Sequence, residues 1–207
     1  MAEKKREDNI TNFYEGDLIV QGDFCAEDYV EVRGNLIIYG SNKSEDIKAK
    51  GSIYIYGNNE SCNLDVGGDI YIFGDNNSGD IEVGTIEAKG NVYIFGKNLS
   101  QDIEAENVYV FGANDSHDIN ADGDIFINGQ NDSCDLMAYN NIFIGDDSES
   151  DDIISDKLVI WGECESREEL HVENIIIRKD LTAKEIHTEK LTIGGKISHK
   201  TIIKPND

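Results

Sequence analysis

The sequence consists of one short phrase repeated along almost its whole length. In its clearest copies the phrase reads Gly-x-Ile-x-Ile-x-Gly and begins at Gly34, Gly51 and Gly68. Copies follow one another about every 17 residues, with one longer step between Gly68 and Gly90. A unit of this length cannot bury its own apolar side chains, so it must stack on neighbouring copies of itself. The repeat therefore constrains the chain to a solenoid.

A second phrase, Asn-x-Ser-x-Asp-Ile-x-Ala, follows the first in most copies, for example from Asn98 to Ala105. Alternation with a period of two runs through both phrases, and this period is typical of β-strands and not of helices. Each copy then supplies three short strands, with glycines where the backbone bends. We predict an all-β, single-domain, right-handed parallel β-helix (solenoid) with a triangular cross-section. It would contain about eleven coils of roughly 16–18 residues and form a rod roughly 50 Å long.

The repeat also sets the expected boundaries. Residues 16–203 are expected to form the parallel β-helix, residues 1–15 a charged N-terminal tail and residues 204–207 a C-terminal tail. The longer step after Gly68 predicts a small loop near Val83 to Glu87. Left-handed hexapeptide helices have coils of similar length, but their apolar residues recur roughly every six positions. The uneven spacing here and the Asn-x-Ser strand favour the right-handed form.

Most aromatic residues fall at outward positions of the first strand. Stacking would align them in two columns, the first of Tyr54, Tyr71, Tyr93, Tyr109, Phe126 and Phe143, the second of Tyr39, Tyr56, Phe73, Phe95, Phe111 and Trp161. One interpretation is structural, because aromatic ladders support a sheet and a terminal segment such as Ile10 to Tyr14 can fold over them. The other is an interface roughly 40 Å long, because large exposed apolar patches mark association sites. All these aromatic residues are candidate interface residues.

Two polar columns are expected beside the apolar ones. Stacked carboxamides can hydrogen-bond from coil to coil, which predicts a structural ladder of Asn42, Asn59, Asn76, Asn98, Asn114 and Asn131. Carboxylates at the same spacing repel one another and either reach solvent or share cations such as Ca²⁺. Their column would contain Asp46, Asp80, Asp102, Asp118, Asp135 and Asp151. The glycine-rich nonapeptide of calcium-binding β-rolls is missing, so we predict no metal site.

Residues with catalytic chemistry form no recurring constellation. The four histidines are far apart in the chain, although stacking could bring His171 and His187 together. The four cysteines lack zinc or CxxC spacing, and Cys62 and Cys134 occupy the same repeat position in coils too far apart for a disulfide. We therefore predict no enzyme and no catalytic, cofactor-binding or metal-binding residues. An enzyme would need a pocket, which only the irregularity near Val83 could build.

The net charge of −24 limits the partners that the chain can have. Such a surface repels phosphate backbones and anionic lipid headgroups, so we expect no nucleic-acid partner and no membrane attachment. Residues 167–207 are nearly neutral, which fits either head-to-tail contacts between unlike ends or a neutral cap. The N-terminus lacks the apolar stretch of a signal peptide, so we expect a cytoplasmic protein with reduced thiols.

The Ile-x-Gly and Asp-Ile-x-Ala phrases, such as Ile94 to Gly96 with Asp102 to Ala105, resemble those of the bactofilins. The resemblance covers roughly Gly16 to Ile203. Bactofilins are polymer-forming bacterial cytoskeletal proteins built as right-handed β-helices of short coils. The resemblance implies a nucleotide-free scaffold that assembles through its end coils into filaments or sheets. The sequence departs from the family in its Asn-x-Ser strand, its aromatic exterior and its strongly negative charge.

These observations predict a self-associating structural or scaffold protein. Its partners would be further copies of itself, in a homo-oligomer or polymer, or another protein. Assembly would use the end coils (around Gly16 to Val20 and Leu191 to Ile203), the aromatic columns, or both. The alternative is a β-helix binding module without catalysis that binds a glycan or a protein partner. Concentration-dependent assembly would favour the scaffold, and saturable binding by a monomer would favour the binding module.

Overall fold

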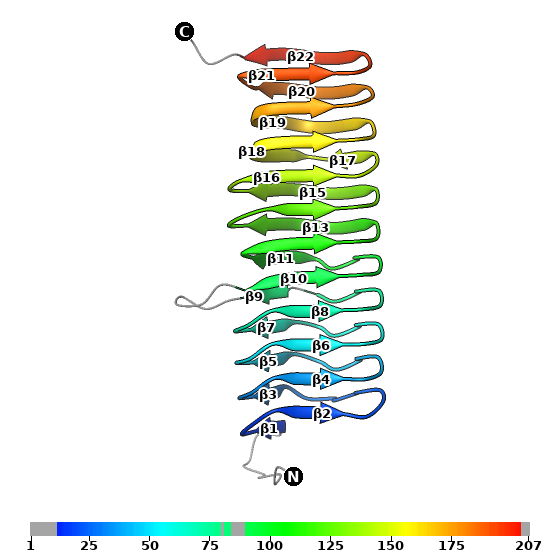
Figure 1. The fold of residues 1–207 in the computed structure, drawn as a ribbon, viewed down its shortest axis with the longest axis vertical. Helices are drawn as coiled ribbons and strands as arrows, with labels where there is room; N and C mark the ends of the chain where they lie inside the picture. The colour runs from blue at the N-terminus through cyan, green and yellow to red at the C-terminus, as the bar shows by residue number, and fades with distance from the viewer. Residues whose placement is uncertain (1–11, 80, 84–89, 204–207) are drawn as a thin grey trace.

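The computed structural model describes residues 12–79, 81–83 and 90–203. This part of the chain contains β-strands and no helix, and the strands pair in parallel within one 22-stranded sheet. Figure 1 shows a straight rod that makes about ten turns, close to the predicted eleven coils. The near strands run from left to right while the chain climbs from the N-terminus, so the coil is right-handed. The predicted loop near Val83 to Glu87 lies outside the described residues after Val83.

Each turn contains three extended segments, and equivalent segments of successive turns pair with one another. The first segment contains the Ile-x-Ile phrase. It forms β2 (Leu18–Val20), β4 (Leu36–Ile38), β6 (Ile53–Ile55), β8 (Ile70–Ile72), β10 (Asn91–Ile94), β12 (Asn107–Val110), β14 (Ile125–Ile127), β16 (Asn141–Ile144), the ends of β18 (Asp152–Ile160) and β19 (Cys164–Ile177), and β21 (Lys190–Ile193).

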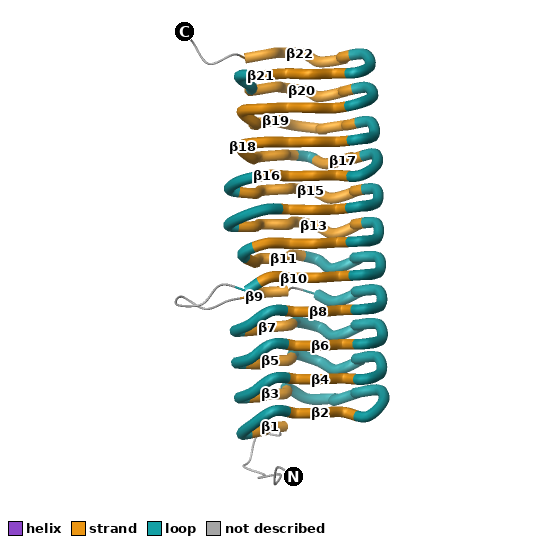
Figure 2. The backbone as a smooth tube through the Cα atoms, viewed as in Figure 1, coloured by secondary structure: helices purple, strands orange, loops and turns teal. Residues whose placement is uncertain are grey.

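The third segment contains the Ile-x-Ala phrase and forms the opposite side of the rod in Figure 1. It comprises β1 (Asn12–Tyr14), β3 (Val30–Val32), β5 (Ile47–Ala49), β7 (Leu64–Val66), β9 (Ile81–Val83) and β11 (Asp102–Ala105), and then parts of β13 (Asn114–Ala121), β15 (Asn131–Ala138), β18, β19, β20 (Leu181–His187) and β22 (Ile197–Ile203). The second segment contains Asn-x-Ser. It forms single bridges up to Asn98 and continuous strand from β13 onward, including β17 (Ser148–Ser150) (Figure 2).

The solenoid begins earlier than the sequence predicts. Asn12–Tyr14 forms β1 and pairs in parallel with Val30–Val32, so these residues are part of a coil and do not cover the aromatic columns. Ile10, the other end of the segment expected to fold over the columns, lies outside the described residues.

The core is a stack of aliphatic side chains inside the coil. Ile53 pairs with Leu36 below it and Ile70 above it, and all three are 0% exposed. The residue between two buried isoleucines, such as Tyr54, points outward and is half-buried. Because each apolar residue is covered by its counterparts in the neighbouring coils, burial depends on the stacking and not on contacts within a coil.

Glycine stands where successive coils approach too closely for a side chain. A Cβ built on Gly57 would lie 2.7 Å from the backbone nitrogen of Ser41, and one on Gly74 would lie 2.7 Å from the Gly57 carbonyl oxygen. Any larger residue would therefore push the coils apart at this corner. The glycine that closes the Ile-x-Ile-x-Gly phrase follows from this close approach.

Short polar side chains hold the corners by accepting backbone N–H groups of the next coil. Asp17 Oδ1 accepts the N–H of Asn35 at 2.7 Å, and Asn35 Oδ1 accepts that of Ser52 at 2.8 Å. At the next corner, Asp75 Oδ1 accepts the N–H of Lys97 at 2.7 Å. These three corner N–H groups, which would otherwise lack a partner, are thereby satisfied by the coil beneath them.

The predicted asparagine ladder is confirmed inside the second segment. Asn42, Asn59, Asn76 and Asn98 are 0% exposed. Each donates Nδ2–H to Oδ1 of the next asparagine at 2.8–2.9 Å, and this continues through Asn114 to Asn131. From Asn59 onward the same amide groups also donate to the serine two residues on, as Asn98 does to Ser100 at 3.0 Å. The column is polar and buried, yet its carboxamides are paired.

Replacing one asparagine of the ladder should destabilise the whole rod. In Asn98→Ala, the Asn76 amide loses an acceptor and the Asn114 carbonyl loses a donor, so we expect the free energy of unfolding to fall by about 2–3 kcal/mol. Asn77→Ala is the matched control, because Asn77 is exposed on the outward side of the same segment. Chemical denaturation, followed by far-UV circular dichroism, measures the free energy of unfolding of both variants and of the parent chain. Equal effects in the two would refute a stabilising role for the ladder.

Candidate functional site

The first aromatic column lies on the outward side of the first segment. Tyr54, Tyr71, Tyr93 and Tyr109 stack with ring centroids 4.8–4.9 Å apart and planes within 1–7° of parallel. The strand register produces this alignment, because Tyr71 pairs with Tyr54 below and Tyr93 above. All four rings are half-buried. They act first as a ladder that supports the sheet.

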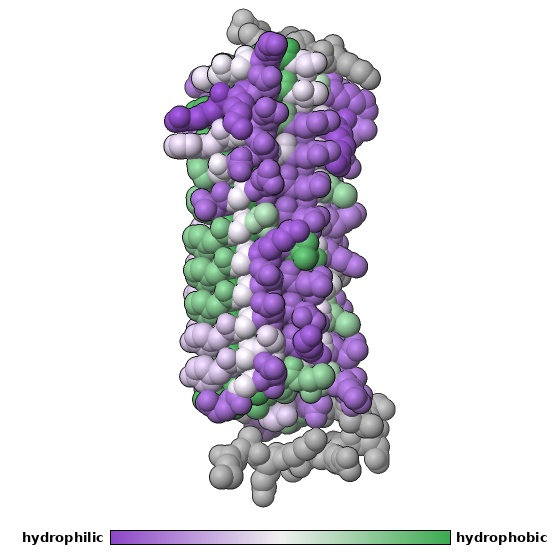
Figure 3. All heavy atoms as spheres, turned by 90° about the vertical axis from the view of Figure 1, so that its right-hand side faces the viewer, coloured by the Kyte–Doolittle hydropathy of each residue, from purple (hydrophilic) through white to green (hydrophobic). Residues whose placement is uncertain are grey.

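The second column is more exposed, and we call its continuous part the aromatic stripe: Tyr39, Tyr56, Phe73, Phe95 and Phe111. Each of these residues follows the last residue of a first-segment strand, and each is 41–52% exposed. Their centroids are 4.8–5.1 Å apart, which makes the stripe about 20 Å long. Viewed from the side of these turns, the rod shows a column of hydrophobic side chains with a paler column beside it (Figure 3).

The stripe is shorter than the sequence predicts, and Trp161 is separate from it. Asn128 and Gly145 follow the corresponding strands of the two intervening coils, so the column has no ring there. Phe126 tilts against Phe111 at 6.0 Å and 51°. Trp161 instead meets Phe143 edge-on at 6.3 Å and lies under the Arg178 guanidinium, 4.0 Å from its centroid. The expected length of roughly 40 Å is therefore wrong for the exposed column.

Ring orientation decides what the stripe can bind. The rings stack with their planes 3–14° apart, so their faces are turned toward one another along the rod. The edges of the rings are what the stripe presents to a partner. Sugar rings pack on aromatic faces, whereas apolar side chains of a protein pack well between ring edges. The geometry thus suits a protein surface better than a glycan.

Burial raises the pKa of three tyrosines of the first column. Desolvation raises the pKa of Tyr71 to about 12, with a further contribution from Asp69, whose carboxylate accepts the phenol O–H at 3.3 Å. Desolvation also raises the pKa of Tyr93 and of Tyr109. The outer face of the first segment thus carries a column of uncharged rings on a molecule with a net charge of −24.

The aspartate column acts as the third corner, and one expected member is wrong. Asp118 Oδ1 accepts the N–H of Asp135 at 3.2 Å, and Asp135 Oδ1 accepts that of Asp152 at 3.2 Å. Asp152 and not Asp151 follows Asp135, because the coil has 17 residues here, as it does between Asp118 and Asp135. Asp80 lies outside the described residues. The aligned carboxylates thus serve as acceptors for the backbone of the next coil.

Stacking also brings each of three histidines against a residue that is distant in the sequence. The predicted neighbours His171 and His187 stack with centroids 5.2 Å apart. His117, for which the sequence predicts no partner, lies beneath Cys134 and between the carboxylates of Asp102 and Asp118. The sequence signal for this group was available, because a pair separated by one repeat length, 17 residues, must be adjacent in a stacked solenoid.

The four cysteines are free thiols in different surroundings. Cys25 and Cys62 are exposed, Cys134 is half-buried and Cys164 is buried. Burial raises the pKa of the Cys164 thiol to about 12, so it stays protonated in the core. These thiols agree with the predicted absence of a disulfide between Cys62 and Cys134.

The two ends of the rod carry open strand edges. Within the described residues, β2 pairs only with β4, and β21 pairs only with β19. The last core residues at each end are only partly buried, including Leu18 and Val20 at one end and Leu191 and Ile193 at the other. An open edge with apolar residues behind it is a surface on which another strand can pair.

Comparison with protein-family models, with curated proteins and with solved structures found no match for the chain. The fold expected from the bactofilin resemblance, a parallel β-solenoid, is present. In the described residues, no helix has the length and apolar character needed to span a membrane.

The tyrosine column predicts a loss of stability at high pH. The folded-state pKa of Tyr71 is about 12 and its unfolded value is about 10, so the fold favours the neutral phenol. This stabilisation is complete below pH 10 and is lost as the pH rises through 12. Tyrosinate absorbance should show a delayed ionisation in the folded chain, and Tyr71→Phe should shrink that delayed step. A folded chain whose tyrosines all titrate near pH 10 would contradict the burial of this column.

Proposed function

We propose that the chain is a non-catalytic scaffold that associates with further copies of itself through the aromatic stripe. The observation that carries this proposal is the exposure of five stacked rings, 41–52% each, in one straight line along a rigid rod. Isolated exposed aromatics are ordinary on protein surfaces, but contiguous apolar patches mark association sites. A regular line of rings on a rigid support is a preformed contact surface.

A second copy is the partner that fits this surface best. It carries the same stripe with the same spacing of 4.8–5.1 Å, so the ring edges of two antiparallel stripes can interlock along their length. A contact of this kind is two-fold symmetric and closes on itself, which gives a dimer of two antiparallel rods lying side by side. The stripe residues themselves carry no charge, so they can meet in spite of the net charge of −24.

The end coils offer a second route to assembly that would turn such pairs into longer structures. The open edges of β2 and β21, with Leu18 and Leu191 behind them, can extend the sheet from one copy into the next. This route is the one that the bactofilin resemblance implies. Membership of that family, a cytoskeletal role and a cytoplasmic location are part of the same proposal.

The alternative, a binding module for a glycan, has less support. Parallel stacking turns the ring faces of the stripe toward one another, and the Trp161 ring has Arg178 over it. A protein partner other than a second copy would use the same ring edges, and it is an outcome that the experiment below can distinguish.

Charge insertion in the stripe should weaken assembly of the purified chain. We expect Phe95→Glu to raise the dissociation constant by about 100-fold, because the introduced carboxylate would be buried against apolar rings of the partner copy at a cost of about 3 kcal/mol. Tyr139→Glu is the matched control, because Tyr139 is 77% exposed and lies outside both columns. Sedimentation velocity over a range of protein concentrations measures the dissociation constant of the parent chain and of both variants. Higher salt should strengthen assembly of the parent chain by screening its charge.

Particle shape separates the two routes. Negative-stain electron microscopy should show pairs with the length of one rod, roughly 50 Å, when the stripe is the contact. Longer rods that persist in Phe95→Glu would assign assembly to the end coils. A parent chain that remains monomeric at high concentration and high salt would overturn self-association and favour a different protein partner.

A further inference from the structure

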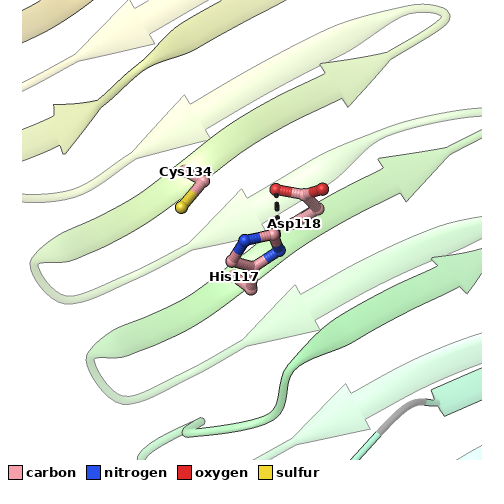
Figure 4. A group of neighbouring side chains, drawn as sticks. All are labelled: His117, Asp118 and Cys134. Atoms are coloured by element: carbon pink, nitrogen blue, oxygen red, sulfur yellow. Dashed lines mark ion pairs between the residues drawn. The ribbon is translucent and has the colours of Figure 1, made fainter.

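Three side chains with different donor atoms converge on the outer surface beside the third corner. His117 and Asp118 belong to β13, and Cys134 lies directly above His117 on β15 (Figure 4). One donor atom from each residue, an imidazole nitrogen, a carboxylate oxygen and the thiol sulfur, lies within 4.8 Å of the other two. Neither the aromatic stripe nor the end coils use these groups.

The imidazole is held in one orientation by carboxylates. His117 Nδ1 is 3.1 Å from Asp102 Oδ1 and 3.3 Å from Asp118 Oδ1. In Figure 4 the other ring nitrogen lies on the side of Cys134. A carboxylate that accepts one ring N–H of a histidine fixes the tautomer and leaves the other nitrogen free as a ligand, which is the usual arrangement in metal sites.

We propose that His117, Asp118 and Cys134 form a binding site for Zn²⁺, with Asp102 as the carboxylate that orients His117. Imidazole, thiolate and carboxylate are the three ligand types that zinc takes from proteins. Tetrahedral zinc places its ligand atoms about 3.3–3.6 Å apart, so small side-chain rotations close the group around an ion. The fourth position is left to water. On binding, the Cys134 thiol releases its proton to solvent and the thiolate bonds to the metal.

Two features of the fold prepare the site. The ligands stand on adjacent strands whose register pairs Asp118 with Asp135, so the backbone positions are fixed before an ion arrives. The surroundings are negative, because Asp135 lies beside the group and Asp151 follows Cys134 in the next coil. Arg167 is the nearby cation, and its guanidinium is already engaged by Glu149 and Asp151.

A second cysteine at the same repeat position shows what the site requires. Cys62 is exposed and has carboxylates close by, with its Sγ 3.0 Å from Glu45 Oε2. The residue beneath Cys62 is this glutamate, whereas the residue beneath Cys134 is His117. Cys62 therefore shares the thiol and the acidic environment but has no imidazole below it. This difference predicts zinc binding at Cys134 and not at Cys62.

The bound proton competes with the metal at this site. Burial raises the pKa of Cys134, with further contributions from Asp151, Asp118 and Asp135 that outweigh the opposing effect of Arg167. Its hydrogen bond to Asp102 likewise raises the pKa of His117. Both groups must be without their competing proton when they bind the metal.

The test uses the full reduced chain, freed of metal by chelation, and titrates it with Zn²⁺ or with Co²⁺ as a spectroscopic probe. We expect one ion per chain, and with Co²⁺ a thiolate-to-metal charge-transfer band in the near ultraviolet. Cys134→Ser should abolish the band, and His117→Ala should weaken binding at least tenfold. Asp102→Asn should weaken it about tenfold, as changes in groups that orient a ligand do.

The matched control is Cys62→Ser, which should leave both the affinity and the band within twofold of the parent. Far-UV circular dichroism confirms that each variant keeps the β-solenoid. Binding without a thiolate band, or equal losses in Cys62→Ser and Cys134→Ser, would mean that the acidic surface attracts cations non-specifically and would overturn the site. Unchanged affinity in His117→Ala would overturn it as well.

Discussion

Contact between successive coils is the interaction on which the rest of this molecule depends. The paired segments belong to different turns, as Tyr71 pairs with Tyr54 and Tyr93, so hydrogen bonds and apolar burial both require neighbours. Equivalent side chains of successive coils therefore lie about 4.8 Å apart wherever a residue type recurs in the repeat. Asparagines become a ladder, aromatic rings a stripe and aspartates a row of acceptors. Structure and candidate surface follow from the same stacking.

The architecture could be predicted from the sequence because the same residue types recur at each strand position in many copies of the repeat. The alternation of Ile and aromatic residues placed Ile53 inside and Tyr54 outside, and the buried Asn column was expected from its spacing alone. Predictions were wrong where a single coil departs from the average. Trp161 is separated from the stripe by two coils that have no ring at the stripe position, and Asp152 takes the position expected for Asp151 because the coil after Asp135 has 17 residues and not 16.

Other features depend on three-dimensional detail that a repeat pattern does not contain. The corner acceptors, such as Asp17 for the Asn35 N–H, arise from the direction in which a turn points its amide groups. The orientation of the rings, with faces covered and edges exposed, depends on side-chain torsions that the sequence leaves open. The group around His117 cannot be recognised within one copy of the repeat, because its members belong to different copies and only the coil length places Cys134 above the imidazole.

The asparagine ladder also gives the rod a direction. Each Nδ2–H donates toward the C-terminal end, from Asn42 to Asn59 and onward to Asn131, so the carboxamide dipoles align head to tail instead of cancelling. Such a chain polarises its own members and places positive potential toward the C-terminal coils. The ladder therefore gives the rod a dipole along its axis. In two rods that lie antiparallel side by side, these dipoles would point in opposite directions, which is the favourable arrangement for neighbouring dipoles.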